Sequence, residues 1–353
     1  MQKQRLDLLA IGDITTDAFI RPKEASVHCD IDKKNCQLCM RFADKIPYEF
    51  VEVVRAVGNS PNAAVAAARL GLSSGLVATM GDDENGRECR EALLKENVDT
   101  TYVSVQKGAK TNYHYVLWFE DERTILVKHE EYAYALPAID PPPKWLYCSS
   151  LGGSSERYHY EIAAYLEKHP EVRFAFQPGT FQIKLGKEKL AKLYRRAELF
   201  FCNREEAERI LSSSSSSSPF ERGGAESARQ RGSEGDMKQL LAGIHALGPQ
   251  IVCITDGPKG AYCFDGHTNE YWFMPPYPDP KPPLNRTGAG DAFSSTFTAA
   301  IIWGKSVREA LALAPINSAF VVQQVGAQRG LLSRDALFDL YAKAPPKYRA
   351  QKI

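Results

Sequence analysis

A short run of small residues beside one carboxylate, from Asn285 to Phe293, is the part of the sequence best suited to chemistry. Gly288, Ala289 and Gly290 are small enough for successive backbone N–H groups to face an anion, and a helix starting there would add partial positive charge. Asp291 could accept the proton of a substrate hydroxyl during phosphoryl transfer. Taken alone, the segment fits a plain capped helix start at least as well, so both interpretations stay open.

The elements that must position these residues alternate along the chain. Short apolar runs typical of buried strands are separated by stretches typical of helices, which predicts a doubly wound, mostly parallel α/β sheet sandwiched by helices. Ligands of such sheets bind beyond the carboxyl ends of the strands. The expected strands are Leu6 to Ile11, Gly75 to Met80, Trp145 to Cys148, Val172 to Phe176, Leu199 to Cys202 and Ile251 to Ile254, and the expected helices are Asn62 to Leu70, Asn85 to Asn97, Glu156 to Lys168, Lys187 to Tyr194 and Asp236 to Leu247.

Three kinds of stretch interrupt this alternation. Phe42 to Val57 and Tyr113 to Lys128 are rich in aromatic and β-branched residues with partial two-residue alternation, which predicts an antiparallel flap. Residues 212–235 contain a serine run, glycines and mixed charge, so we expect a disordered low-complexity insertion. The proline-rich segment Pro275 to Pro283 is expected to be an extended linker.

Composition narrows the class of protein. The 353 residues are 44% hydrophobic and 25% charged, which is ordinary for a globular chain with one large α/β domain or two smaller ones. A net charge of +1 gives no general attraction for nucleic acid or anionic membranes, and no apolar run approaches the ~20 residues of a membrane helix. We therefore expect a cytoplasmic protein without nucleic-acid or membrane partners. Eight cysteines are too few for a disulfide scaffold.

Five segments spread over most of the chain contain distinctive motifs. They are Val57 to Gly71, Gly81 to Asp83 with Gly86, the Asn-x-x-Glu motif Asn203 to Glu206, Thr255 to Gly260, and Thr287 to Asp291. Together and in this order they resemble the motifs of the ribokinase-like (PfkB) family of carbohydrate and nucleoside kinases, whereas any single match would be weak. No dinucleotide-binding G-x-G-x-x-G turn follows the first strand, and no P-loop sequence is present.

The resemblance implies a division of the chain and an assembly. Residues 1–18, 56–111 and 131–345 would form the α/β core, and residues 19–55 and 112–130 would form a small antiparallel β lid over the substrate. Such a lid excludes water and so protects ATP from hydrolysis. A homodimer through the lid is also implied, although Tyr113, Tyr115, Trp118 and Phe119 suit either a dimer face or a substrate wall.

The resemblance also implies an activity, ATP-dependent phosphorylation of a hydroxymethyl group on a small sugar or nucleoside. Asp291 would be the general base, and Gly288, Ala289 and Gly290 would form the anion hole. Turn and capping roles remain alternatives for several of the other residues, a capping box among them. The implied substrate-binding residues are Asp17, Gly58, Asn59 and Asn62; the implied nucleotide-binding residues are Asn203, Thr255, Gly257, Gly260, Thr287 and Asn317; Asn203 and Glu206 would place Mg²⁺ through water, and Gly326 with Ala327 would flank the adenine.

The sequence departs from the family pattern at Asn285, where an acidic residue is usual, and at Val57, where a glycine is usual. In relatives that bind K⁺ the acidic residue helps to hold the cation, so its loss predicts little activation by K⁺. The same change leaves open a catalytically weak sugar- or nucleotide-binding regulator. The acceptor is also open, because Lys45, Arg123, Lys128 and His129 could meet a phosphate already on the sugar or could serve solubility alone.

Three cysteines near the N-terminus have the spacing of a zinc knuckle. Cys29, Cys36 and Cys39 supply only three thiolates, and His28 points away from its neighbour unless the chain turns sharply. Because a fourth zinc ligand is lacking, the sequence favours reduced thiols packed in a hairpin over a structural zinc site.

Overall fold

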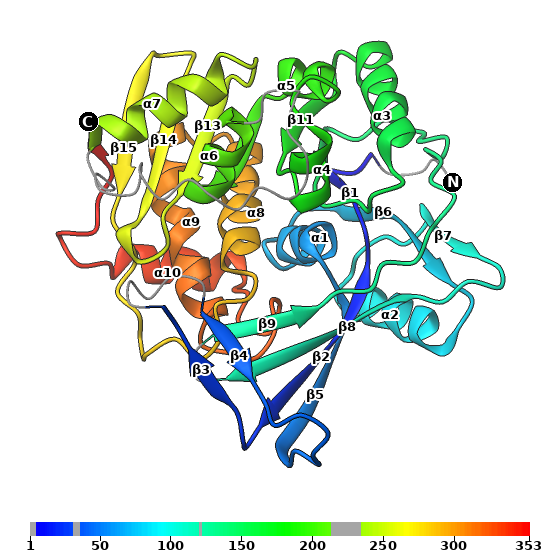
Figure 1. Cartoon of the computed structure of the whole chain (residues 1–353). Coiled ribbons are helices and arrows are strands. Elements are labelled where there is room, and N and C mark those ends of the chain that lie inside the picture. The colour runs from blue at the N-terminus through cyan, green and yellow to red at the C-terminus, as the bar shows by residue number, and fades with distance from the viewer. Residues whose placement is uncertain (1–4, 31–35, 120–121, 213–233) are drawn as a thin grey trace.

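The computed structural model describes residues 5–30, 36–119, 122–212 and 234–353. Within these ranges a central sheet has the strand order β16-β15-β14-β13-β12-β11-β10-β1-β6-β7, parallel from β7 to β13 and antiparallel from β13 to β16 (Figure 1). The strands are β1 Leu8–Ile11, β6 Ser74–Gly81, β7 Val103–Gln106, β10 Trp145–Cys148, β11 Arg173–Phe176, β12 Leu199–Asn203, β13 Ile251–Thr255, β14 Ala261–Asp265, β15 Glu270–Met274 and β16 Gln351–Lys352.

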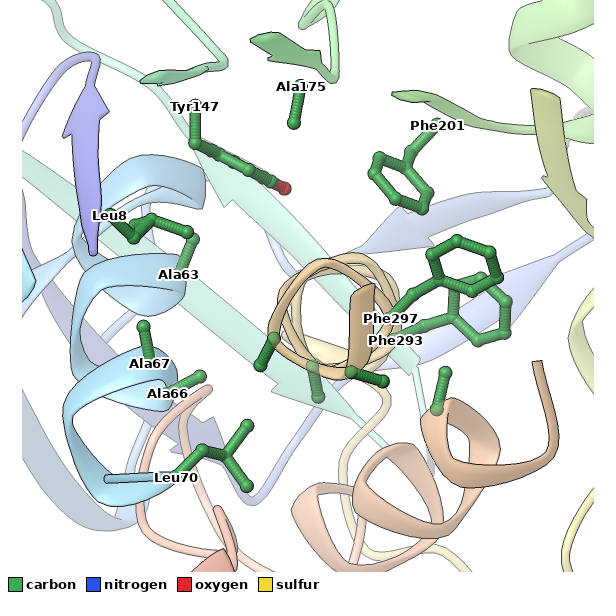
Figure 2. Close-up of a cluster of buried hydrophobic side chains, with 14 of the residues drawn as sticks. Leu8, Ala63, Ala66, Ala67, Leu70, Tyr147, Ala175, Phe201, Phe293 and Phe297 are labelled. Carbon is green, nitrogen blue, oxygen red and sulfur yellow. The ribbon is translucent and has the colours of Figure 1, made fainter. Parts of the chain in front are cut away.

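Helices cover both faces of this sheet, because its central strands are apolar on both sides. Leu8 and Ala10 of β1 pack with α1, α8, α9 and α10, whereas Leu9 and Ile11 pack with α3, α5, α6 and α7. Figure 2 shows the first layer, in which Phe297 of α8 meets Phe201 of β12 edge to face at 5.6 Å. The helices are α1 Asn59–Arg69, α2 Glu84–Lys95, α3 Glu156–Lys168, α4 Thr180–Leu185, α5 Ala191–Arg196, α6 Arg204–Ser212, α7 Glu234–His245, α8 Ala289–Ile302, α9 Val307–Val321 and α10 Arg334–Ala342.

A second, smaller sheet lies beside the core and contains the flap segments, as β2 Thr15–Pro22, β5 Tyr48–Val57, β8 Asn112–Phe119 and β9 Glu122–Leu126 (Figure 1). We call this sheet the lid. Its order is β5-β2-β8-β9, and β2 pairs antiparallel with β5 but parallel with β8. The small antiparallel lid expected from the sequence is therefore present, and it includes one parallel pair, β2 with β8. Strand β2 also begins at residue 15 and so takes up residues that the sequence assigned to the core.

Most expected elements are present with ends shifted by a few residues. Strand β10 and helix α3 have the expected bounds, but the helix expected from Lys187 is replaced by α5, which begins at Ala191. The linker Pro275 to Pro283 has no helix or strand, as expected, while β7 and the antiparallel strands β14 to β16 were not expected. Most of the proposed insertion at 212–235 lies outside the described residues. Across the described ranges, the helices are too short or too polar to span a membrane.

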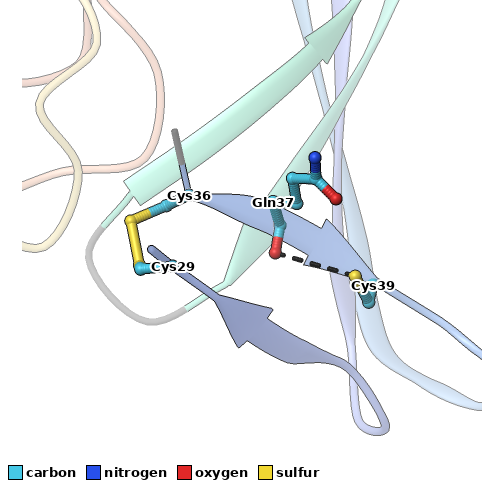
Figure 3. The surroundings of a disulfide bond; sticks show 4 residues. All are labelled: Cys29, Cys36, Gln37 and Cys39. Atoms are coloured by element: carbon cyan, nitrogen blue, oxygen red, sulfur yellow. Dashed lines mark hydrogen bonds between the residues drawn. A yellow bond between two sulfur atoms is a disulfide. The ribbon is translucent and has the colours of Figure 1, made fainter. Parts of the chain in front are cut away.

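The cysteines of the lid hairpin differ from both sequence interpretations. Strands β3 Ser26–His28 and β4 Gln37–Cys39 form a two-stranded hairpin, and Cys29 and Cys36 beside it form a disulfide (Figure 3). The two cysteines are therefore not reduced thiols, and a disulfide removes two of the three thiolates that zinc would need. Cys39 stays free, and its thiol donates to the Gln37 carbonyl. Across the described chain no three His, Cys, Asp or Glu side chains group as metal ligands.

Candidate active site

The start of α8 forms an open row of backbone amides. Gly288 caps the helix with φ of +80°, and a Cβ there would lie 2.4 Å from the Cβ of Ala327, so only glycine fits. The first amide of this segment with a helical partner is that of Ala292, which donates to the Gly288 carbonyl at 2.8 Å. The amides of residues 289–291 have no backbone acceptor in the described parts of the chain, as expected for a first helical turn. They can therefore receive an anion.

Asp291, in the first turn of α8, is held by three side-chain amides. Its Oδ1 accepts hydrogen bonds from Asn59 at 2.7 Å and Gln177 at 3.1 Å, and its Oδ2 accepts one from Asn62 at 2.8 Å. The residue is 8% exposed. Burial raises the pKa of the Asp291 carboxyl above its ordinary value, while the hydrogen bonds from Asn62, Asn59 and Gln177 oppose that rise. A raised pKa suits a carboxylate that must take up a proton.

Gln177 is a site residue that the sequence reading missed. It follows the carboxyl end of β11, and its Oε1 accepts hydrogen bonds from the hydroxyls of Tyr147 and Ser294. These two donors fix the amide orientation, so that its NH₂ group must face Asp291. The signal in the sequence that could have identified Gln177 is its position directly after a parallel strand, because ligands of such sheets bind beyond the carboxyl ends of the strands.

A cavity of about 530 Å³ lies between the lid and the start of α8. Its lining includes the expected acceptor residues Asp17, Gly58, Asn59 and Asn62, together with Thr287, Gly288, Gly290 and Asp291. We call this the acceptor cavity. Asp17 lies on β2, and its buried Oδ1 has no hydrogen-bond partner among the described residues. A carboxylate oxygen of this kind can accept a hydrogen bond from a ligand hydroxyl.

Two histidines of the acceptor cavity stand against carboxylates. Nδ1 of His114 lies 3.3 Å from Oδ1 of Asp17, and Nδ1 of His129 lies 3.3 Å from Oδ2 of Asp13. The hydroxyl of Tyr134 donates to the other Asp13 oxygen at 2.8 Å. The sequence identified Asp17 as an acceptor contact and His129 as a candidate phosphate contact, but it missed His114, Asp13 and Tyr134.

A second cavity, of about 500 Å³, lies on the other side of Gly290. We call it the nucleotide cavity, because two of the expected nucleotide contacts, Gly257 and Gly260, line it. Ala289 of the expected anion hole also lines it, and Pro315, Ala319 and Val322 give it an apolar wall. Thr287 lines the acceptor cavity instead. Asn203, Thr255 and Gly290 line both cavities, so the two spaces meet at the first turn of α8.

Asn203 and Glu206 cap α6 reciprocally. The Asn203 amide donates to Oε2 of Glu206 at 2.9 Å, and the Glu206 amide donates to Oδ1 of Asn203 at 2.8 Å. The structural alternative, a capping box, is therefore present. Both residues also line the acceptor cavity, and burial raises the pKa of Glu206. One carboxylate and one amide oxygen fit a hydrated Mg²⁺ bound through water, so the two roles are compatible.

Two expected nucleotide contacts are placed elsewhere. Asn317 is fully buried, its NH₂ donates to Thr296 at 2.9 Å, and its Oδ1 accepts from the Leu332 amide at 2.9 Å. This side chain ties α9 to α8 and lines neither cavity, so the structure does not bring it to the other expected nucleotide contacts. Ala327 packs beneath Gly288 at the acceptor cavity rather than beside an adenine site.

Asn285, the main departure from the family pattern, is buried in the turn before α8. Its Oδ1 accepts a hydrogen bond from the Thr287 amide at 2.7 Å. The side chain therefore shapes the turn as a neutral acceptor, where a carboxylate would bring a charge.

Comparisons with known proteins agree with this geometry. A family model described as pfkB family carbohydrate kinase matches residues 32–334. The chain is 26% identical to a ribokinase of Bacillus subtilis over 288 residues, covering 80% of this chain and 86% of that protein. A structure of Arabidopsis thaliana ribokinase complexed with ribose and ATP superposes with a TM-score of 0.73 at 19% identity, covering 96% of this chain and 99% of the other.

A structure of a putative ribokinase II from E. coli in complex with ATP and Mg²⁺ superposes with a TM-score of 0.70 at 17% identity, covering 96% of this chain and 99% of the other. At these identities the solved structures establish the fold, and the family model establishes the membership. The chain belongs to the pfkB family of carbohydrate kinases, and it is an enzyme of the sugar and nucleoside kinase class.

Proposed function

We propose that the protein transfers the γ-phosphoryl group of ATP to a hydroxymethyl group of a small sugar or nucleoside. The observation that carries this proposal is the junction of the two cavities, where the open amides of residues 289–291 and the buried carboxylate of Asp291 lie on one helical turn. The acceptor oxygen bonds to the γ-phosphorus, the bond from that phosphorus to the β–γ bridging oxygen breaks, and ADP leaves. The hydroxyl proton passes to Asp291.

The acceptor occupies the acceptor cavity in this proposal. Oδ1 of Asp17, which accepts no hydrogen bond from the described residues, accepts one from a hydroxyl of the sugar ring, and Gly58 lets the ligand approach the backbone. Asn59 and Asn62 act mainly on the base, because their NH₂ groups hold the Asp291 carboxylate. Ordered donors around a catalytic base reduce the reorganisation that the reaction requires.

ATP occupies the nucleotide cavity, with its base against the apolar wall and its γ-phosphoryl group at Gly290. Asn203 and Glu206 would hold Mg²⁺ through water, and the metal would neutralise charge on the phosphates. Support for this comes from their place on the lining of the acceptor cavity beside Gly290 and from the E. coli structure with ATP and Mg²⁺. Thr287, whose buried hydroxyl oxygen has no partner among the described residues, is placed to contact the transferred group.

A homodimer through the lid is part of the proposal. The lid face turned away from the acceptor cavity exposes Val51 and Val53 of β5, Tyr115 of β8 and Leu126 of β9. A contiguous apolar face of this kind is typical of a protein interface, and a second copy of the chain would cover it. Light scattering should give twice the monomer mass for the native protein and the monomer mass for Val53→Asp, whereas a monomeric native protein would exclude the dimer.

Release of ADP in the presence of a panel of sugars and nucleosides tests the activity. Asp291→Ala should lower kcat by about 10² or more while MgATP still binds, because a positioned general base contributes that much. Unchanged turnover in this variant would remove Asp291 from the mechanism. ATP binding without ADP release for any acceptor would instead favour a regulator on the same fold.

A further inference from the structure

One end of the acceptor cavity has buried polar atoms that the described part of the protein leaves unpaired. Oδ2 of Asp13, Oδ1 of Asp17, Nε2 of His114 and Nδ1 of His129 make no hydrogen bond with any described residue. Both histidines line the cavity, and the centroids of their rings lie 5.2 Å apart. Buried polar groups are nearly always paired, so a group of unpaired atoms at a cavity indicates that a polar ligand completes the arrangement.

Asp13 stands behind the ring of His129. It lies just past the carboxyl end of β1, is 7% exposed and does not line the cavity itself. Its Oδ1 accepts a hydrogen bond from the Tyr134 hydroxyl at 2.8 Å, and its Oδ2 lies 3.3 Å from Nδ1 of His129. A carboxylate beside one ring nitrogen favours hydrogen on that nitrogen. Nε2 of a neutral His129 is therefore the nitrogen that can accept a hydrogen bond from a ligand.

The ring of His129 is also held on a second side. Phe181 of α4 meets it edge to face, with the ring centroids 5.4 Å apart, and lines the same cavity. Gly152 leaves room for the contacts behind the ring, because a Cβ there would lie 2.9 Å from the Tyr134 hydroxyl oxygen. A side chain that is fixed in this way can distinguish between ligands that differ in one hydroxyl group.

Three of the candidate phosphate contacts from the sequence are not placed to bind a phosphate on the acceptor. Lys45 and Lys128 do not line the acceptor cavity, and Nζ of Lys128 lies 2.8 Å from Oε1 of Glu130. His129 lines the cavity, but its Nδ1 faces the carboxylate of Asp13. The remaining candidate, Arg123, stands among carboxyl groups.

The charges on the lining disfavour a second phosphate. Among the described residues, the carboxyl and guanidinium groups that line the acceptor cavity are those of Asp17, Glu206, Asp291, Arg123 and Arg286. Carboxyl groups are therefore in the majority even before ATP brings its own negative charge to this site. A phosphate on the acceptor would be repelled by them, whereas hydroxyl groups would find hydrogen-bond acceptors.

We propose that His129, held by Asp13, binds a hydroxyl group of the acceptor through Nε2, and that this pair selects an uncharged sugar over a phosphorylated sugar or a nucleoside. The inference rests on the proposed function. A sugar offers one hydroxyl to His129 and another to Asp17. The flat apolar face of a nucleoside base would instead leave most of these buried polar atoms unpaired, which is unfavourable. His129 is thus a specificity residue, and Asp13 is a positioning residue that acts through it.

The test compares His129→Phe and His129→Gln with the control His169→Phe. Phenylalanine keeps a ring against Phe181 but lacks the nitrogen atoms, whereas glutamine keeps a hydrogen-bond acceptor. His169 is a matched control, because it lies 3.3 Å from Oε1 of Glu171 and packs on Tyr165 but does not line the acceptor cavity. ADP release gives kcat and KM with D-ribose, D-fructose, D-fructose 6-phosphate and adenosine, and thermal unfolding checks that each variant is folded.

The native protein should have its highest kcat/KM with D-ribose or D-fructose, about 100-fold or more above the values for D-fructose 6-phosphate and adenosine. D-Fructose and its 6-phosphate form a matched pair, because both carry a free hydroxymethyl group on C1. His129→Phe should raise the KM of the preferred sugar about tenfold with little change in kcat, the loss expected for one hydrogen bond made equally in ground and transition states. His129→Gln should recover part of this loss, and His169→Phe should match the native protein.

Deoxy derivatives of the preferred sugar, each lacking one hydroxyl group, identify the group that His129 binds. One derivative should have a KM about tenfold higher in the native protein but no further loss in His129→Phe, because both changes remove the same hydrogen bond. Asp13→Asn should raise the KM of the sugar in the native protein but not in the His129→Phe background, since Asp13 acts through the histidine.

Three results would overturn the inference. They are a preference for D-fructose 6-phosphate or adenosine, an unchanged sugar KM in His129→Phe, and losses that add fully for every deoxy derivative and for Asp13→Asn. A native protein that releases no ADP with any acceptor would overturn the proposed function instead.

Discussion

Replacing Gln177 by methionine should move the pH dependence of turnover. The amide of Gln177 is one of three donors to the Asp291 carboxylate, at 3.1 Å, and methionine keeps its length but donates nothing. The lost hydrogen bond favoured the charged form, so its removal raises the pKa of Asp291 further. A hydrogen bond to a charged group contributes about 1.5–3 kcal/mol, which corresponds to roughly 1–2 pKa units.

The structure argues that the substitution acts locally. The hydroxyl oxygens of Tyr147 and Ser294, which both donate to Oε1 of Gln177, lie 2.8 Å apart, so in the variant one hydroxyl can donate to the other. Gln250, whose amide donates to the Gly248 carbonyl at 3.2 Å and which does not line the acceptor cavity, offers a matched Gln→Met control.

The assay is kcat for ADP release between pH 5 and 9 in the native protein and both variants. The acidic limb of the Gln177→Met profile should move to higher pH by about 1–2 units, with turnover approaching the native value at high pH. The Gln250→Met profile should coincide with the native one. If the Gln177→Met profile keeps its midpoint, then Gln177 does not tune the base and the role derived for it is wrong.

Four further results are expected. Gly290→Ala adds a methyl group at the point where the two cavities meet, and no atom lies within 4 Å of that group. The substitution should stabilise α8 by about 0.5–1 kcal/mol in urea unfolding, because alanine favours a helix over glycine. It should nevertheless lower turnover about 10²-fold, because the methyl group displaces the reacting groups. Glu206→Gln keeps the reciprocal cap but loses the carboxylate, so the Mg²⁺ concentration for half-maximal turnover should rise about tenfold without loss of stability. Burial acts to raise the pKa of Asp83, but hydrogen bonds from Thr111 and Gly86 outweigh it, so the pKa is lowered. Asp83→Ala should therefore cost about 1–2 kcal/mol at neutral pH, a difference that is present above the unfolded pKa and is lost as pH falls through the lower folded pKa. With Asn285 in the turn before α8, replacing Na⁺ by K⁺ should leave turnover unchanged, and a several-fold rise would contradict this.

The sequence predicted the parts of the fold in which the signal is local. The segment Trp145 to Cys148 is apolar on both faces, so its own residues are enough to predict a buried strand. Gly288 is likewise explained locally, by the geometry of the one turn in which it lies. The antiparallel strands β14 to β16 carry weaker patterns, and β16 is placed by pairing with β15, about 80 residues earlier in the chain. The parallel pairing of β2 with β8 was missed for the same reason, since strand direction in the lid is set by where each strand leaves the core.

For the site, the sequence identified residues with distinctive chemistry and missed those defined by their neighbours. Asp291 and Asp17 are carboxylates beside recognisable motifs, and both line the acceptor cavity. Gln177 is an ordinary amide until Tyr147 orients it, and this contact joins two different strand ends. Asn317 illustrates the opposite kind of difference. The sequence assigned this polar residue to the nucleotide because of the motif around it, whereas in the structure its side chain bonds to Thr296 and to the Leu332 amide in the protein interior.

The division of the site between the lid and a core helix has a consequence for how the range of acceptors can change. Asp17 and His114 lie on lid strands, whereas Asp291 and the open amides belong to a core helix. Mutations that reshape the inner surface of β2 or β8 can therefore admit a different alcohol while the apparatus that cleaves ATP stays intact. Directed evolution toward a new acceptor should accordingly accumulate its substitutions in the lid and leave the first turn of α8 untouched.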